Sequence, residues 1–328
     1  MFQQRCSTPE FGPRLSVMPQ QIEPPVSTLE ATYKARETEG ILDLYFYRPI
    51  GFRLARFFAK MNVSPAGVTL LACLSGIIAG HLFFYRDLRT NVAGMALLVC
   101  ANALDNADGQ LARLTHRESR EGRIVDSLAD HLVFVSIYIH LTLRYLVAGA
   151  SPAILLLALA AGISHALQGA AADYYRTNYL YFATNRSRME LDSSSLLRSK
   201  FRSLTWHQEP WHKFLLALYL NFTRQQEMLS PNLRKVREAG SQLFGGQIPT
   251  WLKSRYQSLG GPALKWWGLL MTNTRMLILF ALLFIGQPVW YFWFELIALN
   301  ALLVYLIIRQ EDMADSLLEV AVRWHHSA

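Results

Sequence analysis

Long apolar segments alternate with shorter polar ones along most of this chain. Each apolar segment reaches about 20 residues, the length that an α-helix needs to cross roughly 30 Å of hydrocarbon. Six such segments follow one another, at residues 64–85, 91–113, 123–147, 152–172, 266–286 and 288–308. The pattern therefore predicts an all-α protein built as a bundle of six transmembrane helices.

A shorter amphipathic segment precedes the first predicted span. Between residues 40 and 61, leucine, tyrosine and phenylalanine side chains alternate with arginines, as they do in helices that lie on a membrane surface. Ser64 and Pro65 then supply an N-cap and a first helical residue for the span that follows. We expect an interfacial helix at residues 40–61 and, before it, a disordered tail at residues 1–39 that is rich in proline.

The stretch between the fourth and fifth spans, residues 173–265, is too polar to cross a bilayer and too long for a plain connection. Within residues 176–265, lysines and arginines outnumber acidic residues by nine, which exceeds the formal excess of +8 of the whole chain. Aromatic residues such as Trp211 and Phe214 accompany these charges at helical spacing. We predict a helical insertion with a membrane-surface helix; a small soluble subdomain is the alternative. No known nucleic-acid module appears, so nucleic acid is not an expected partner.

Composition and charge placement extend this picture. Hydrophobic residues make up 52% and charged residues 17% of the chain, and the mean hydropathy is +0.16, as expected of a multi-pass protein. Basic residues flank the spans on one side, at Arg48, Arg53, Arg56, Lys60, Arg113, Arg117, Arg120 and Arg123. The positive-inside rule places both termini in the cytoplasm, and we expect residence in the cell (inner) membrane.

The predicted units are 1–39, 40–172, 173–265 and 266–328, the last holding spans five and six with a C-terminal tail.

A stripe of small residues runs along the fourth predicted span. Ala158, Gly162, Ala166 and Ala170 recur every four residues, so one face of this helix has no bulk and allows another helix backbone to come close. Packing within the chain and a dimer interface explain the stripe equally well. We expect membrane lipid as a partner and a homodimer.

Four aspartates lie at the ends of the second and third spans, where each costs up to about 3 kcal/mol on insertion scales. Asp105 and Asp108 are three residues apart, and Asp126 and Asp130 are four apart, so each pair projects from one helix face. An antiparallel hairpin would bring both pairs to one depth below the cytoplasmic surface. Such a cluster must take up protons or bind cations, and oxygen ligands suit Mg²⁺ or Mn²⁺.

The residues beside the aspartates suit a phosphorylated ligand. Gly109 and Ala112 let a ligand approach the helix backbone, and the Arg113 guanidinium can donate a bidentate pair of hydrogen bonds to phosphate. A divalent ion next to such residues is what a pyrophosphate-bearing substrate requires.

The complete pattern resembles the signature of the CDP-alcohol phosphatidyltransferase family. It reads Asp105-x2-Asp108-Gly109-x2-Ala112-Arg113-x8-Gly122-x3-Asp126-x3-Asp130. The resemblance implies that the four aspartates hold Mg²⁺ or Mn²⁺, expected as two ions, and that Asp130 is also the base that deprotonates the acceptor hydroxyl. It further implies that Gly109, Ala112, Arg113 and Gly122 line the site for the CDP part of the donor, and that CMP leaves.

The identities of acceptor and donor stay open at this point. Arg176, near the end of the fourth span, and Arg275, inside the fifth, are candidates for binding the acceptor; interfacial anchoring and a buried ion pair are the respective alternatives. The favoured reaction moves the phosphatidyl group of CDP-diacylglycerol onto a small alcohol in phospholipid biosynthesis. The alternative moves a phospho-head group from a soluble CDP-alcohol onto a lipid or another alcohol. A cation carrier is a remote third, because its acids should be spread through the bilayer and not gathered at one end.

Overall fold

The computed structural model describes residues 36–184, 193–243 and 248–327, and these contain helices and no strand. The all-α prediction is therefore confirmed. The main helices are α1 (Arg48–Lys60), α2 (Pro65–Leu82), α3 (Leu88–Leu114), α4 (Arg120–Val147), α5 (Ala153–Tyr179), α6 (Ser194–Ser203), α7 (Pro210–Leu229), α8 (Pro231–Leu243), α9 (Thr250–Gly260), α10 (Leu264–Gly268), α11 (Thr272–Phe284), α12 (Trp290–Trp293) and α13 (Asn300–Ser327). Short turns of 3₁₀ or π helix join or extend them, including η2 (Arg36–Thr38), η3 (Asp43–Tyr47), η4 (Leu180–Thr184) and η6 (Phe294–Leu299).

Five helical stretches of the described chain are long and apolar enough to cross a membrane: Pro65–Leu82, Arg120–Val147, Ala153–Ala183, Thr250–Phe284 and Trp290–Ala321. They identify a multi-pass architecture. The expected second span, α3, is not among them, because asparagines and aspartates occupy much of its second half. The count of six spans is thus not confirmed by length and composition.

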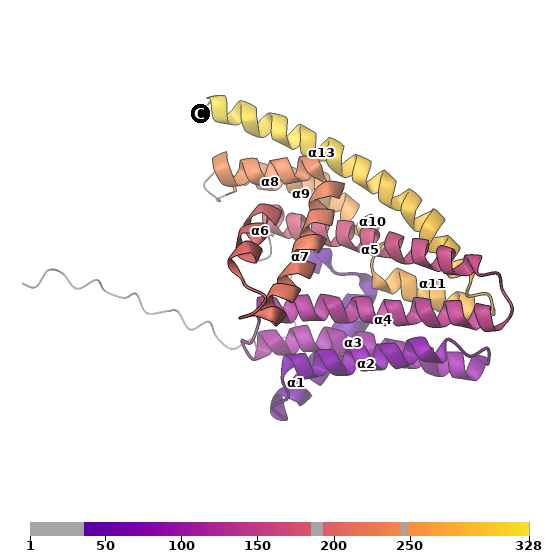
Figure 1. The fold of residues 1–328 in the computed structure, drawn as a ribbon. Coiled ribbons are helices and arrows are strands. Elements are labelled where there is room, and N and C mark those ends of the chain that lie inside the picture. Colours follow the sequence, from indigo (N-terminus) through magenta and orange to yellow (C-terminus); the bar gives the residue numbers. More distant parts are fainter. Residues whose placement is uncertain (1–35, 185–192, 244–247, 328) are drawn as a thin grey trace, which may run out of the picture.

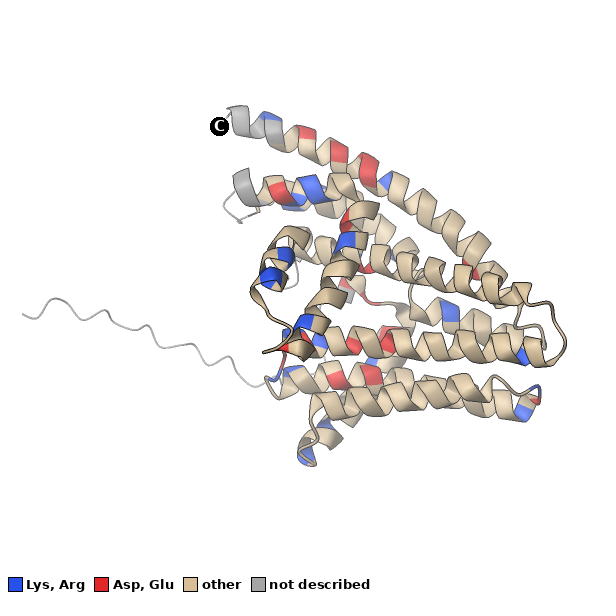
Figure 2. Cartoon of the chain, viewed as in Figure 1, with Lys and Arg blue, Asp and Glu red and all other residues tan. Residues whose placement is uncertain are grey.

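The helices form two groups (Figure 1). Helices α2, α3, α4, α5 and α11 run side by side, whereas α6, α7, α8 and α9 gather at one end and α13 passes obliquely along the outside toward them. Contacts of α13 with α8 and α9 join the groups. Basic residues are concentrated at the end where α6 to α8 lie, with fewer at the opposite end (Figure 2).

Helix α2 is the element against which the site-bearing helices pack, since both α3 and α4 contact it closely. Two glycines explain how close α4 comes. A Cβ atom on Gly76 would lie 2.5 Å from the Val133 side chain, and one on Gly80 would lie 2.6 Å from Ser136 Oγ and 2.9 Å from the backbone nitrogen of Ile137. Small residues of this kind let helix backbones approach in a membrane.

The small-residue stripe on α5 also packs within the chain. Ala158 is buried in a core with Tyr138 of α4, and a Cβ on Gly162 would lie 3.8 Å from the ring of the same tyrosine. These contacts support the intramolecular alternative for this part of the stripe. The expected homodimer stays a prediction.

Several boundaries differ from those predicted. The interfacial segment is helical from Ile41 through α1. The fifth span is interrupted at 269–271, and the last helix continues well past residue 308 as α13 because Ala314 and Leu317 bury themselves against α8 and α9. Most of the predicted tail, residues 1–35, lies outside the described residues.

We predict that Gly80→Ala lowers the free energy of unfolding by about 1–3 kcal/mol, because the new methyl group meets the α4 backbone and forces two helices apart. The matched control is Gly169→Ala on α5, where a Cβ would meet no atom within 4 Å. We expect the control to change stability by less than about 1 kcal/mol or to raise it. Thermal unfolding of both variants in the same detergent provides the comparison, and equal midpoints would contradict the packing argument.

Candidate functional site

Three of the four predicted aspartates converge. Asp105 and Asp108 of α3 and Asp126 of α4 each offer a carboxylate oxygen, and these oxygens all lie within 4.8 Å of one another. Asp108 is 5% exposed, whereas Asp105 and Asp126 are partly buried. Three acceptor-only groups this close repel one another unless protons or cations neutralise them.

The connection between α3 and α4 accounts for the convergence. The chain turns back within residues 115–119, where His116 adopts a left-handed φ of 52°, and α4 starts again with Ser119 as its N-cap, whose Oγ accepts from Gly122 N at 2.9 Å. Asp108 lies six residues before the end of α3 and Asp126 six residues after the start of α4. At 1.5 Å per residue both lie about 9 Å from the turn, so they reach the same depth.

A residue that the sequence analysis missed completes this group. Thr69 of α2 is buried, and its Oγ1 donates to Asp108 Oδ2 at 2.5 Å while also contacting the carbonyl of Pro65 at 3.1 Å. The hydroxyl therefore fixes one carboxylate oxygen. A threonine in an apolar helix usually forms a hydrogen bond with its own helix backbone, so no local pattern predicts its contact with Asp108.

Asp130 lies one turn further along α4 and is not part of the three-carboxylate group in the described chain. It lines a small cavity of about 30 Å³ together with Asp105, Asn102, Thr272 and other residues of α2, α3, α4 and α11. A space of this size holds an ion or a water molecule. The structure thus brings Asp130 to the cavity that Asp105 also faces.

The residues expected to line the donor site occupy the end of α3 and the start of α4. Gly109 and Ala112 lie in the last two turns of α3, and the Arg113 guanidinium folds back to 3.6 Å from the place of a Cβ on Gly109. Gly122 is in the exposed first turn of α4. All four flank the aspartate group along the chain.

Arg176 takes part in an ion-pair cluster at the end of α5. Its Nη2 lies 3.1 Å from Glu39 Oε1, and Arg48 Nη2 of α1 lies 2.8 Å from the same oxygen. Gln110 of α3 donates to the Arg48 carbonyl at 3.2 Å. Glu39, the last residue of the predicted tail, is therefore held at a junction of α1 and α5 beside α3.

Arg275 lies in the first turn of α11 and is 2% exposed. Its Nε lies 3.2 Å from Glu295 Oε1, and its Nη2 donates to Gln168 Oε1 at 2.6 Å. His165 Nδ1 approaches the same Glu295 oxygen at 3.6 Å. These contacts match the buried ion pair that the sequence left as one alternative, and a contact with the acceptor stays a prediction.

The donor set fits a divalent hard cation. Carboxylate oxygens from Asp105, Asp108 and Asp126 are the ligand type that Mg²⁺ and Mn²⁺ prefer, and they are close enough to share one ion. The described residues near them offer no thiolate or imidazole to this group. Such a group could hold an ion of the kind that assists reactions at phosphate.

Comparison with known proteins identifies the same region. Residues 62–186 match the family described as CDP-alcohol phosphatidyltransferase. The chain is similar to the CDP-diacylglycerol-serine O-phosphatidyltransferase of Mycobacterium tuberculosis, with 33% identity over 85 residues, 26% of this chain and 29% of that protein. The Mycobacterium leprae protein of the same name is 31% identical over 80 residues, 24% and 26% of the two chains.

An archaeal relative is similar over a comparable stretch. The archaetidylinositol phosphate synthase of Pyrococcus horikoshii is 33% identical over 95 residues, which are 29% of this chain and 49% of that protein. The matched part thus spans less than a third of the mycobacterial relatives and about half of the archaeal one. The family match contains every residue of the aspartate motif and ends before α6. Over residues 62–186, this chain carries a domain of the CDP-alcohol phosphatidyltransferase family.

Proposed function

We propose that this protein is a membrane enzyme that transfers the phosphatidyl group of CDP-diacylglycerol to the hydroxyl of a small alcohol and releases CMP, in phospholipid biosynthesis. The observation that carries the proposal is the convergence of Asp105, Asp108 and Asp126 inside the family-matched domain. The mycobacterial relatives are named for a CDP-diacylglycerol donor, which supports this donor over a soluble CDP-alcohol.

In the proposed reaction the acceptor oxygen attacks the phosphorus that carries the lipid. Asp130 takes the hydroxyl proton, and the bond between this phosphorus and the oxygen that bridges to CMP breaks, so that CMP leaves with the bonding electron pair. Mg²⁺ or Mn²⁺ at the aspartates would neutralise the pyrophosphate and the charge that develops on the leaving oxygen. Thr69 keeps Asp108 oriented through its 2.5 Å hydrogen bond. We also propose that the aspartates hold two metal ions and that Asp130 is one of the metal ligands.

Gly109, Ala112, Arg113 and Gly122 are proposed to receive the CDP part of the donor. The glycines and alanine leave the helix ends open to phosphate oxygens, and the guanidinium supplies a charged donor beside them. Arg176 is proposed to help bind the acceptor. In the structure Arg176 and Arg48 both form an ion pair with Glu39. The two guanidinium groups therefore already bind one carboxylate, and they would attract an anionic group of the acceptor.

We propose that α3 crosses the membrane as a sixth span. Its 27 residues extend about 40 Å at 1.5 Å per residue, and its neighbours α2 and α4 are both candidate spans. The polar residues that lower its hydropathy include those of the site. Both termini would then be cytoplasmic, since the basic end of the bundle carries α6 to α8. Residence in the cell membrane and a homodimer complete the proposal.

The activity test is CMP release by the purified protein in lipid, supplied with CDP-diacylglycerol and a panel of small alcohols. We expect release with at least one alcohol, complete loss in excess EDTA and recovery when Mg²⁺ or Mn²⁺ is restored, because the aspartates need neutralisation before they accept a pyrophosphate. Full activity in excess EDTA would contradict the metal role. Release only from soluble CDP-alcohols with a lipid acceptor would favour the alternative reaction.

Asp130→Asn tests the proposed base. We expect turnover to fall by about 10²-fold or more, because an amide cannot accept the acceptor proton, and we expect no recovery at raised Mg²⁺. Asp126→Asn should differ by recovering in part, since its main defect is weaker metal binding. Asp315→Asn, exposed on α13, is the control with unchanged turnover. Wild-type turnover of Asp130→Asn would remove the base assignment.

Arg275→Lys separates the two roles considered for this residue. Lysine keeps the charge but lacks the planar guanidinium group that contacts both Glu295 and Gln168. From these contacts we expect a loss of about 1–3 kcal/mol in stability with both KM values unchanged in the folded fraction. Arg309→Lys on the exposed face of α13 serves as the control. A raised KM for the acceptor with an unchanged melting temperature would instead support an acceptor contact.

A further inference from the structure

A cavity separate from the aspartate site lies where α6, α7 and α8 meet. Its volume is about 350 Å³, which is in the range of small-ligand sites. It is lined by Ser194, Arg198, Arg224, Glu227, Met228, Pro231 and Arg234. All of these residues follow the part of the chain that matches the family.

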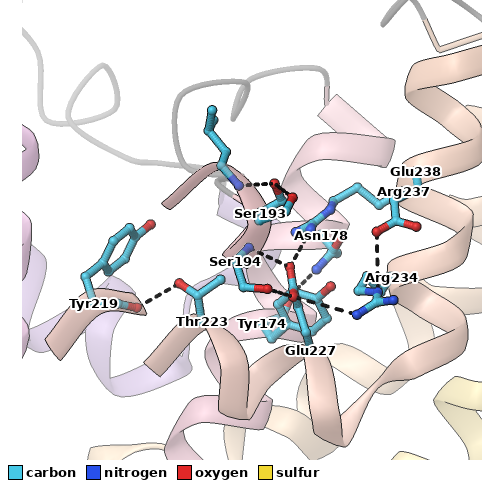
Figure 3. A network of polar contacts seen from close by, with 12 residues as sticks. Tyr174, Asn178, Ser193, Ser194, Tyr219, Thr223, Glu227, Arg234, Arg237 and Glu238 are labelled. Carbon is cyan, nitrogen blue, oxygen red and sulfur yellow. Dashed lines mark hydrogen bonds and ion pairs between the residues drawn. The ribbon is translucent and has the colours of Figure 1, made fainter. Parts of the chain in front are cut away.

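The one acidic residue of the lining is already satisfied. Glu227 is 5% exposed, and its Oε1 accepts from Arg237 Nη2 at 2.9 Å and from the Ser194 backbone nitrogen at 3.1 Å. Its Oε2 accepts from Ser194 Oγ at 2.5 Å. Figure 3 shows this carboxylate enclosed by Ser194, Arg237 and Arg234. Arg237, which is buried and does not line the cavity, therefore balances the charge of Glu227.

Two of the three arginines of the lining have no acidic partner among the described residues. Arg234 Nη1 lies 4.0 Å from Glu227 and its Nε lies 3.4 Å from Glu238 at the surface. The side chains of Arg198 and Arg224 are exposed and make no hydrogen bond or ion pair with the side chain of any other described residue. Guanidinium groups that converge on one cavity repel one another, and an anion with several oxygens would relieve that repulsion through two-pronged hydrogen bonds.

We propose that the cavity between α6, α7 and α8 is a binding site for a phosphate group, held by Arg198 and Arg224 with Arg234 at its edge. Helix α7 also exposes Trp211 and Phe214, and aromatic residues of this kind favour the membrane interface. The phosphate can accordingly come from a lipid headgroup or from solution. The site is independent of the catalytic role proposed for the aspartates.

The test uses the full chain in nanodiscs, with EDTA present so that no metal-dependent phosphate binding at the aspartates contributes. Inorganic phosphate is titrated in neutral phosphatidylcholine discs, and phosphatidic acid is introduced in a second series at rising mole fraction. The shift of the melting temperature reports binding in both series. Arg198→Gln/Arg224→Gln is compared with Arg202→Gln/Lys235→Gln, which removes the same charge from exposed positions on α6 and α8 outside the lining.

We expect the pocket variant to weaken binding about tenfold or more and the control to stay within about twofold. A response to phosphate alone identifies a soluble ligand, a response to phosphatidic acid alone identifies a lipid headgroup, and a response to both supports phosphate recognition from either source. No response of the wild type to either probe, or equal losses in the two variants, would overturn the proposal.

A second pair of variants keeps the test decisive if the arginine variant does not fold. Met228 lines the cavity and is 76% exposed, so changes there should leave folding intact. Met228→Glu places a negative charge at the site and should abolish binding, whereas Met228→Gln, nearly equal in shape, should preserve it. Equal binding by these two variants would also overturn the proposal.

Discussion

The close approach of α2 to α4 at Gly76 and Gly80 is the contact on which the site depends. Because these positions lack side chains, the backbone of α4 lies against α2, while α3 packs against α2 as well. One helix thereby holds both aspartate-bearing helices. It also supplies Thr69, whose hydroxyl orients Asp108. The position of the carboxylates follows from backbone packing on α2 together with the short turn between α3 and α4.

Charged groups inside the bundle occur in two arrangements, an ion pair and a cluster of carboxylates. Arg275 and Glu295 neutralise each other and are almost wholly buried, with Gln168 and His165 beside them. Such a pair satisfies itself and needs no ligand, although losing one partner would leave the other uncompensated. The carboxylates of Asp105, Asp108 and Asp126 instead lie next to one another. Protons or cations have to relieve the repulsion among these carboxylates, whereas Arg275 and Glu295 already neutralise each other.

The helices beyond the family-matched domain make physical contact with the site-bearing part. Helix α7 contacts the start of α4, where the Arg120 guanidinium lies 5.2 Å from the ring centre of Tyr219 and His212 Nε2 lies 3.4 Å from Glu121 Oε1. Gln226 of α7 also donates to Asp173 of α5 at 3.0 Å. Helix α7 therefore packs on α4 and α5. Basic residues are concentrated at this end of the bundle (Figure 2).

The sequence by itself determined the helical class, the recurrent apolar segments and the aspartate motif, because these depend on local periodicity and on spacing within one or two helices. It placed Asp105 and Asp108 on one face of a helix and predicted that Asp126 and Asp130 would join them. Asp126 does so, whereas Asp130 lies outside the three-carboxylate group and lines the cavity that Asp105 also lines. The sequence could not show that Thr69 contacts Asp108 or that Arg275 pairs with Glu295, since partners far apart in the chain leave no local pattern. The tertiary structure also decided the lengths of the later helices: α13 continues past the predicted end of its span because α8 and α9 offer it a second apolar surface. The sequence showed the excess of basic residues in this part of the chain. It could not show the cavity between α6, α7 and α8, because that cavity forms only where the three helices meet.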